Sequence, residues 1–273
     1  MAENSKIEWT DHTFNPWTGC TKVSPGCDHC YAEGWAKRSG AVKWGAGEPR
    51  RRTTEANWRL PLKWNRQAAD EGRRFKVFCA SLADVFDNSV PPEWRADLFK
   101  LAADTPHLDW LLLTKRIGNV FRMLPFGWQD FGAPANLWIG ATIVNREEML
   151  RDAAKLKDVP ARVRFWSVEP LLEDLGTIPR ELMPEWVIVG GESGPGARPM
   201  NPHWARSIRD QCKEAGVPFL FKQWGEYAPH VLVVDTEARR IVHRNLETGM
   251  ARIGKKAAGR MLDGVTHDGY PAP

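Results

Sequence analysis

The sequence predicts an α/β fold whose parallel strands form a full or partial (β/α) barrel. Short apolar runs rich in β-branched and aromatic residues recur about every 25 to 30 residues, with helix-like segments between them. The runs are nearly continuous in hydrophobicity, which is typical of strands buried on both faces of a parallel sheet. Polar residues follow six of them, and a barrel brings all such strand ends to one mouth, whereas an open sheet uses only its switch point. The six polar ends therefore favour the barrel.

The elements can be placed in order along the chain. Strands are expected at residues 76–81, 109–114, 137–143, 163–168, 186–190 and 218–222. Helices are expected between them at 92–104, 145–156 and 203–215, and the last of these ends at Gly216 as helices often do. A further, first strand is expected at 13–19, leading directly into a loop with three cysteines.

Residues 231–273 break this pattern. Residues 231–235 and 240–243 predict a β-hairpin, and a Gly-Lys-Lys-Ala-Ala-Gly segment follows at 254–259. Two domains are therefore expected. Residues 1–230 form the barrel with its N-terminal cysteine loop, and 231–273 form a small C-terminal appendage of hairpin and basic tail.

Composition limits the classes of function. The chain has 273 residues and five cysteines, an odd number, and no apolar stretch that resembles a signal peptide or a membrane span. These features predict a cytoplasmic protein with no membrane partner, which uses its thiols for metal or redox chemistry. The net charge of +4, the basic clusters Arg50–Arg52 and Lys255–Lys256, and 14 tryptophans permit a nucleotide, DNA or RNA partner. A solvated basic surface is the alternative.

Three cysteines, Cys20, Cys27 and Cys30, fall within eleven residues. Three thiolates can hold a [4Fe-4S] cluster and leave one iron open, whereas a structural zinc site closes four protein ligands around the ion. Two alternatives remain for this loop, namely a redox Cys-x-x-Cys pair and a zinc site. Candidates for the fourth zinc ligand are His12, His29, Cys79 and Cys212. Cys79 and Cys212 are expected to be small core residues, since they lie on a predicted strand and a predicted helix.

Several short motifs of the sequence are similar to those of the phage-associated three-Cys-motif family. That family occurs in bacteriophages and bacterial genomes and is usually described as a domain of unknown function. The motifs are Asn15-Pro-Trp-Thr-Gly-Cys20, Cys27-Asp-His-Cys-Tyr-Ala32, Ser167-Val-Glu-Pro-Leu171, Val189-Gly-Gly-Glu-Ser193 and Lys222-Gln-Trp-Gly-Glu226. A three-cysteine loop after the first strand also resembles the radical S-adenosylmethionine (radical SAM) superfamily. The first cysteine gap is six residues here, and the usual loop of that superfamily has three.

The resemblance implies a barrel of the radical SAM type. It implies that Cys20, Cys27 and Cys30 bind a [4Fe-4S] cluster, that S-adenosylmethionine binds its open iron, and that an external electron donor reduces it. Cleavage of the cofactor would generate a 5′-deoxyadenosyl radical that abstracts hydrogen from a substrate, for which a nucleotide or nucleic acid is the expectation.

The same resemblance suggests residues for the cofactor. Gly190, Gly191 and Glu192 are similar to the superfamily's Gly-Gly-Glu element, which holds the methionine amine, although here they follow a late strand. Ser167 and Glu169 are candidates for the ribose or the amine, and Lys115, Arg116 or Lys222 for the carboxylate. Structural salt bridges are the alternative for each of these residues. The rival function is a zinc-stabilised, non-catalytic nucleic-acid-binding phage protein.

Overall fold

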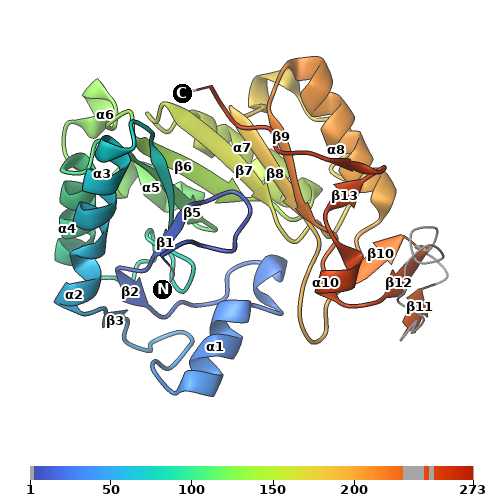
Figure 1. The fold of residues 1–273 in the computed structure, drawn as a ribbon, viewed down its shortest axis with the longest axis horizontal. Helices are drawn as coiled ribbons and strands as arrows, with labels where there is room; N and C mark the ends of the chain where they lie inside the picture. Colours follow the sequence, from blue (N-terminus) through green and yellow to red (C-terminus); the bar gives the residue numbers. More distant parts are fainter. Residues whose placement is uncertain (1–2, 230–242, 246–248, 273) are drawn as a thin grey trace. The chain divides into compact units, whose positions relative to one another are not determined.

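A computed structural model describes residues 3–229, 243–245 and 249–272 (Figure 1). Seven strands form one sheet in the order β1-β4-β5-β6-β7-β8-β9. They are β1 (His12–Phe14), β4 (Phe75–Cys79), β5 (Leu108–Thr114), β6 (Leu137–Thr142), β7 (Val163–Val168), β8 (Trp186–Gly190) and β9 (Phe219–Gln223). The strands follow one another in chain order, and the sheet begins with β1 and ends with β9 without closing. Such a sheet is a partial (β/α) barrel. The predicted fold class is confirmed, and the six strands expected from 76 onward lie within two residues of their observed bounds.

The chain divides into two compact units. The first consists of Met1–Ser24, Cys30–Ala141 and Lys155–Arg164, and the second of Pro25–His29, Thr142–Ala154 and Phe165–Pro273. The division runs through the cysteine loop, so that Cys20 and Cys30 belong to the first unit and Cys27 to the second.

In the first unit, β4 pairs in parallel with β1 on one side and with β5 on the other, so that Val77 lies opposite both His12 and Trp110. The helices are α1 (Tyr31–Ser39), α2 (Glu55–Trp58), α3 (Leu60–Asp70), α4 (Pro92–Ala103), α5 (Ile117–Met123) and α6 (Trp128–Phe131). Helix α4 has proline at its first position, where the missing N–H costs no helical hydrogen bond. It buries Leu98 and Phe99 in the core.

The first strand is shorter than expected. The sequence predicted a strand over 13–19, but β1 ends at Phe14. Pro16 has no N–H to donate to a ladder, and the chain leaves the parallel sheet there. Trp17–Thr18 (β2) instead pairs antiparallel with Arg51–Arg52 (β3).

In the second unit, β8 pairs in parallel with β7 and β9. Its helices are α7 (Arg146–Lys157), α8 (Pro202–Ala215) and α10 (Lys255–Ala258), and its 3-10 turns are η1 (Pro25–Cys27) and η2 (Arg180–Leu182). The last residues of α7, from Lys155 onward, belong to the first unit. The side chain of Asn201 caps α8 by accepting a hydrogen bond from the His203 N–H. The helix ends at Gly216, which has φ of 72°, as the sequence predicted.

The C-terminal part contains two small antiparallel sheets. One has β10 (Tyr227–Pro229), β12 (Met250–Arg252) and β11 (His243–Asn245), and the other has β13 (Met261–Leu262) and β14 (Val265–Thr266). Asp263 and Gly264 make the turn of the second hairpin with positive φ at both positions. The tail then binds the free edge of β9, since the Gly269 N–H donates to the Phe219 carbonyl.

The hairpin expected at 231–235 and 240–243 lies outside the described residues except for His243. The predicted domain boundary at residue 230 therefore stays a prediction. None of the helices in the described part of the chain has the length and apolar character needed to cross a membrane.

Candidate functional site at the carboxyl ends of the strands

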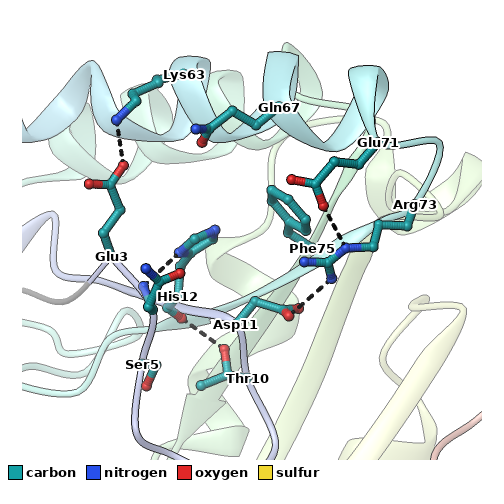
Figure 2. Close-up of a pocket in the computed structure, with 11 residues that line it drawn as sticks. Glu3, Ser5, Thr10, Asp11, His12, Lys63, Gln67, Glu71, Arg73 and Phe75 are labelled. Carbon is teal, nitrogen blue, oxygen red and sulfur yellow. Dashed lines mark hydrogen bonds and ion pairs between the residues drawn. The ribbon is translucent and has the colours of Figure 1, made fainter.

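A polar pocket of about 510 Å³ lies at the amino ends of β1 and β4 in the first unit (Figure 2). Its charged side chains pair with one another. Lys63 bonds Glu3 at 2.7 Å, and Arg73 bonds both Asp11 at 3.2 Å and Glu71 at 2.8 Å. These charges are already compensated, whereas the residues that the sequence singles out lie at the opposite, carboxyl ends. The candidate site therefore lies at the carboxyl ends of the strands.

Cys20 lies beside the segment that follows β4. The residue before it, Gly19, forms a parallel bridge with Ala83. Arg116, which follows β5, donates from one guanidinium nitrogen to the Cys20 sulfur at 3.4 Å and from the other to the Thr21 carbonyl at 2.7 Å. The first cysteine of the motif is thus held beside a cation at the carboxyl end of the sheet.

The charge environment of Cys20 combines opposing effects. Burial raises the pKa of its thiol to about 11, and the carboxylate of Asp84 acts in the same direction. The guanidinium of Arg116 lowers the pKa and so limits the rise. At neutral pH the free thiol is protonated, so that binding of a cation to the sulfur would release a proton.

Asp84 connects Arg116 to the strand ends. One carboxylate oxygen accepts from the Thr114 hydroxyl at 2.7 Å. The other accepts from the Lys115 N–H at 3.1 Å and from Arg116 at 3.0 Å. Lys115 is therefore fixed through its backbone at the end of β5, and its predicted contact with a carboxylate stays a prediction.

The structure corrects one prediction for the basic cluster Arg50–Arg52. The side chain of Arg50 is fully buried and bonds Asp87 at 2.7 Å, so it cannot reach a phosphate. Arg52 lies 4.1 Å from the ring centre of Trp58 and bonds Asp97 at 2.7 Å. Of the three arginines, only Arg51 is an exposed residue.

In the second unit, the predicted residues Ser167, Glu169 and Gly190 lie together with Lys222. One Glu169 oxygen, Oε2, lies 3.3 Å from the Ser167 hydroxyl and 3.2 Å from Lys222 Nζ. The other, Oε1, is buried and has no hydrogen-bond partner in the described structure. A Cβ at Gly190 would lie 2.5 Å from that oxygen, so a larger residue at this position would displace the carboxylate. This carboxylate has one oxygen available for a ligand.

Glu192, the third residue of the Gly-Gly-Glu element, has both oxygens engaged. Arg198 donates to Oε1 at 2.6 Å, and to Oε2 at 2.8 Å from both its backbone N–H and its Nε. His29 Nδ1 lies 3.2 Å from Oε2. Burial acts to raise the pKa of Glu192, but these hydrogen bonds outweigh it and lower the pKa.

Arg198 also fastens the segment that contains Cys27. It donates to the Pro25 carbonyl at 3.0 Å and to the Asp28 carboxylate at 3.1 Å. Gly196 gives His29 the space it needs, since a Cβ there would lie 2.8 Å from His29 Nε2. Arg198 could not be predicted from the sequence, because an arginine in an irregular loop belongs to no periodic pattern.

Gly191 is needed for contact between two loops of the protein. Its N–H donates to the Gln223 carbonyl at 2.9 Å, and a Cβ there would collide with the Trp224 carbonyl oxygen. Gly225 in turn has φ of 82° and leaves no room for a Cβ against the Glu192 carbonyl. The predicted roles of Gly190, Gly191 and Glu192 toward a cofactor stay predictions.

The motif cysteines are not oxidised to disulfides. Cys27 is buried in η1, and Cys30 is the residue before α1. Cys79 and Cys212 are fully buried, as expected of core residues. Among residues 3–229, 243–245 and 249–272, no three histidine, cysteine, aspartate or glutamate side chains are grouped so that they could hold a metal ion.

These features define an α/β protein with a partial (β/α) barrel and polar groups at the carboxyl ends of its strands. The chain belongs to the family described as "Protein of unknown function (DUF5131)", whose model matches residues 4–271. No curated protein matches the sequence.

Among solved structures, the chain is similar to spore photoproduct lyase. A variant with bound AdoMet and dinucleoside spore photoproduct is 12% identical with a TM-score of 0.48, over 81% of this chain and 58% of that one. A second variant is 14% identical with a TM-score of 0.47, over 91% and 70% of the two chains. The chain thus spans less than two thirds of the first of these proteins.

Proposed function

We propose that this protein is an iron–sulfur enzyme of the radical SAM type, in which Cys20, Cys27 and Cys30 hold a [4Fe-4S] cluster. The observation that carries the proposal is the position of Cys20. Its sulfur lies 3.4 Å from the side chain of Arg116, which is two residues beyond the end of β5. This is the end of the sheet at which (β/α) barrels have their active sites. The partial barrel and the three-cysteine motif are the further support.

The donor chemistry of the loop suits such a cluster, and its binding would have to bring the three thiols together. Cysteine thiolates are the usual ligands of [4Fe-4S] clusters, and three of them leave one iron open. All three thiols are free of disulfides, and the guanidinium of Arg116 offsets negative charge at the first. A reduced cluster with S-adenosylmethionine would supply a 5′-deoxyadenosyl radical for hydrogen abstraction.

Residues of the second unit suit the amino-acid part of that cofactor. The free Oε1 of Glu169 is placed to accept from an ammonium group, and Lys222, 3.2 Å from Oε2, is a cation for a carboxylate. Ser167 supplies a hydroxyl beside them, and Lys115 of the first unit is a second candidate for the carboxylate. Glu192 has no free oxygen, so its part is to hold the loop that contains Cys27.

The substrate class that we propose is a nucleotide or nucleic acid, with reduction by an external electron donor. Lys255 and Lys256 are exposed on α10 and available to phosphates. If they contact phosphates, affinity should fall steeply with salt concentration.

Anaerobic reconstitution with iron and sulfide tests the proposal. The protein should turn brown and absorb at about 400 nm, and the band should bleach on reduction. Cys20→Ala, Cys27→Ala and Cys30→Ala should each lose the cluster, while the control Cys212→Ala should keep it, because Cys212 is buried in α8. A colourless protein with one tightly bound zinc would refute the proposal and favour the zinc-stabilised binding protein.

A further inference from the structure

Helix α1, which follows Cys30, carries an aromatic and basic stripe. Tyr31, Trp35 and Arg38 are four and three residues apart, so they lie on one face of the helix. A neighbouring face is buried through Ala32 and Ala36. Tyr31 is 61% exposed, Trp35 is partly exposed and Arg38 is exposed. The stripe is therefore open to solvent along the helix.

The loop after α1 continues the same chemistry. Between Trp35 and Arg52 the sequence has five basic residues, of which Arg50 is buried, and one acidic residue, Glu48. Lys43 is exposed and Trp44 partly exposed in this loop. Within the described part of the chain, Arg38 and Lys43 form no ion pair, and neither Trp35 nor Trp44 stacks on another aromatic ring. These cations and indole rings are thus available to a ligand.

The stripe begins at the candidate site. The Tyr31 hydroxyl donates to the Ser81 carbonyl at 2.6 Å, and Ser81 lies two residues beyond the carboxyl end of β4. Helix α1 begins there with Tyr31 and extends away from the sheet (Figure 1). A chain-like ligand on this helix would reach the strand ends where Cys20 lies.

We infer that α1 and the loop that follows it, through Tyr31, Trp35, Arg38, Lys43 and Trp44 and here called the α1 surface, bind single-stranded nucleic acid. Bases of a single strand expose their faces to aromatic side chains, and each stacked base contributes about 1–3 kcal/mol whatever its identity. Arginine and lysine beside the rings meet the phosphates. A duplex hides its base faces, so this surface favours the single strand. The inference deepens the proposed function by naming where its substrate binds, but the binding itself needs no cluster.

Fluorescence anisotropy with a labelled thymidine oligonucleotide, about 20 nucleotides long so as to exceed one binding site, tests the inference. Trp35→Ala and Trp44→Ala should each weaken binding by about 5- to 150-fold. Tyr31→Ala should weaken binding to a similar extent, because it removes a further exposed ring of the surface. Arg38→Gln should weaken binding and reduce the slope of log affinity against log salt by about 0.7. A duplex of the same length should bind less tightly.

Matched controls come from the same unit. Phe126→Ala removes a fully exposed aromatic ring, and Arg66→Gln an exposed cation on α3. Neither should change the affinity. The inference would be overturned by no binding at about 50 mM salt, by equal losses in the controls, by tighter binding of the duplex, or by binding to anionic lipid vesicles instead of the oligonucleotide.

A second arm separates this inference from the proposed function. The variant with all three of Cys20, Cys27 and Cys30 changed to alanine should bind the oligonucleotide like the parent protein, provided that circular dichroism shows it folded. Binding by a protein that takes up no cluster would refute the proposed function and support the α1 surface. A protein that takes up the cluster but binds no oligonucleotide would refute the α1 surface alone.

Discussion

Replacing Arg116 by methionine removes a buried cation and keeps most of the side-chain volume. The Arg116 side chain is 10% exposed and bonds Asp84 at 3.0 Å and the Thr21 carbonyl at 2.7 Å. A hydrogen bond between charged groups contributes about 1.5–3 kcal/mol and one to a carbonyl about 1 kcal/mol. The change also leaves Asp84, whose side chain is 7% exposed, without its cation. We therefore expect the free energy of unfolding to fall by about 3–5 kcal/mol, the usual cost of breaking a buried pair.

Urea denaturation followed by circular dichroism measures this loss. Lys100→Met is the matched control, because Lys100 pairs with Asp104 in an exposed position and should cost only about 0.3–0.5 kcal/mol. The double variant Arg116→Met with Asp84→Asn should recover part of the loss, since it removes the uncompensated charge. A loss below about 1 kcal/mol, or no recovery in the double variant, would show that Arg116 does not stabilise the carboxylate of Asp84.

Three further predictions concern single positions. Gly191→Ala should lower the free energy of unfolding by on the order of 3 kcal/mol, because the added Cβ collides with the Trp224 carbonyl. The control Gly118→Ala on α5 has room for a Cβ and should change this free energy by no more than about 1 kcal/mol. Equal effects of the two changes in urea titrations would contradict the loop contact. Asp263→Asn should cost about 1 kcal/mol at pH 7. The pKa of Asp263 is lowered to about 2 by bonds from two arginines, so this stabilisation exists above its unfolded pKa of about 3.9 and should be lost toward pH 2 in pH-dependent melts. Cys79 and Cys212 should resist iodoacetamide until the protein unfolds, because burial raises the pKa of both, to about 12 for Cys212; rapid labelling of the native protein, read by peptide mass spectrometry, would contradict their burial.

The sheet could be predicted from the sequence because its strands are buried on both faces and are therefore continuous apolar runs. β7 and β8 have the predicted bounds, 163–168 and 186–190. β1 has only three residues, one of them His12, and gives too short a signal to separate it from Trp17–Thr18.

The candidate site could be predicted only in part. Residues that follow a buried strand, such as Glu169, can be recognised from their position, but the partner of each side chain cannot. Glu192 binds Arg198 and His29, both from irregular loops. The cluster Arg50–Arg52 was misjudged because successive side chains in extended chain point to opposite sides, which buries Arg50 and exposes Arg51.

The hydrogen bonds from Arg198 to Pro25 and Asp28 can form only late in translation, after residue 198 has been added to the chain. Asp28 and Arg198 are 170 residues apart. At about 5–20 residues per second, the segment around Cys27 waits about 10–30 seconds on the ribosome before its partner has been made. Until then the first cysteines emerge without the loop that fixes them. If Cys20, Cys27 and Cys30 hold a cluster as proposed, the loop that fixes the Cys27 segment becomes available to that site only after residue 198 has been made.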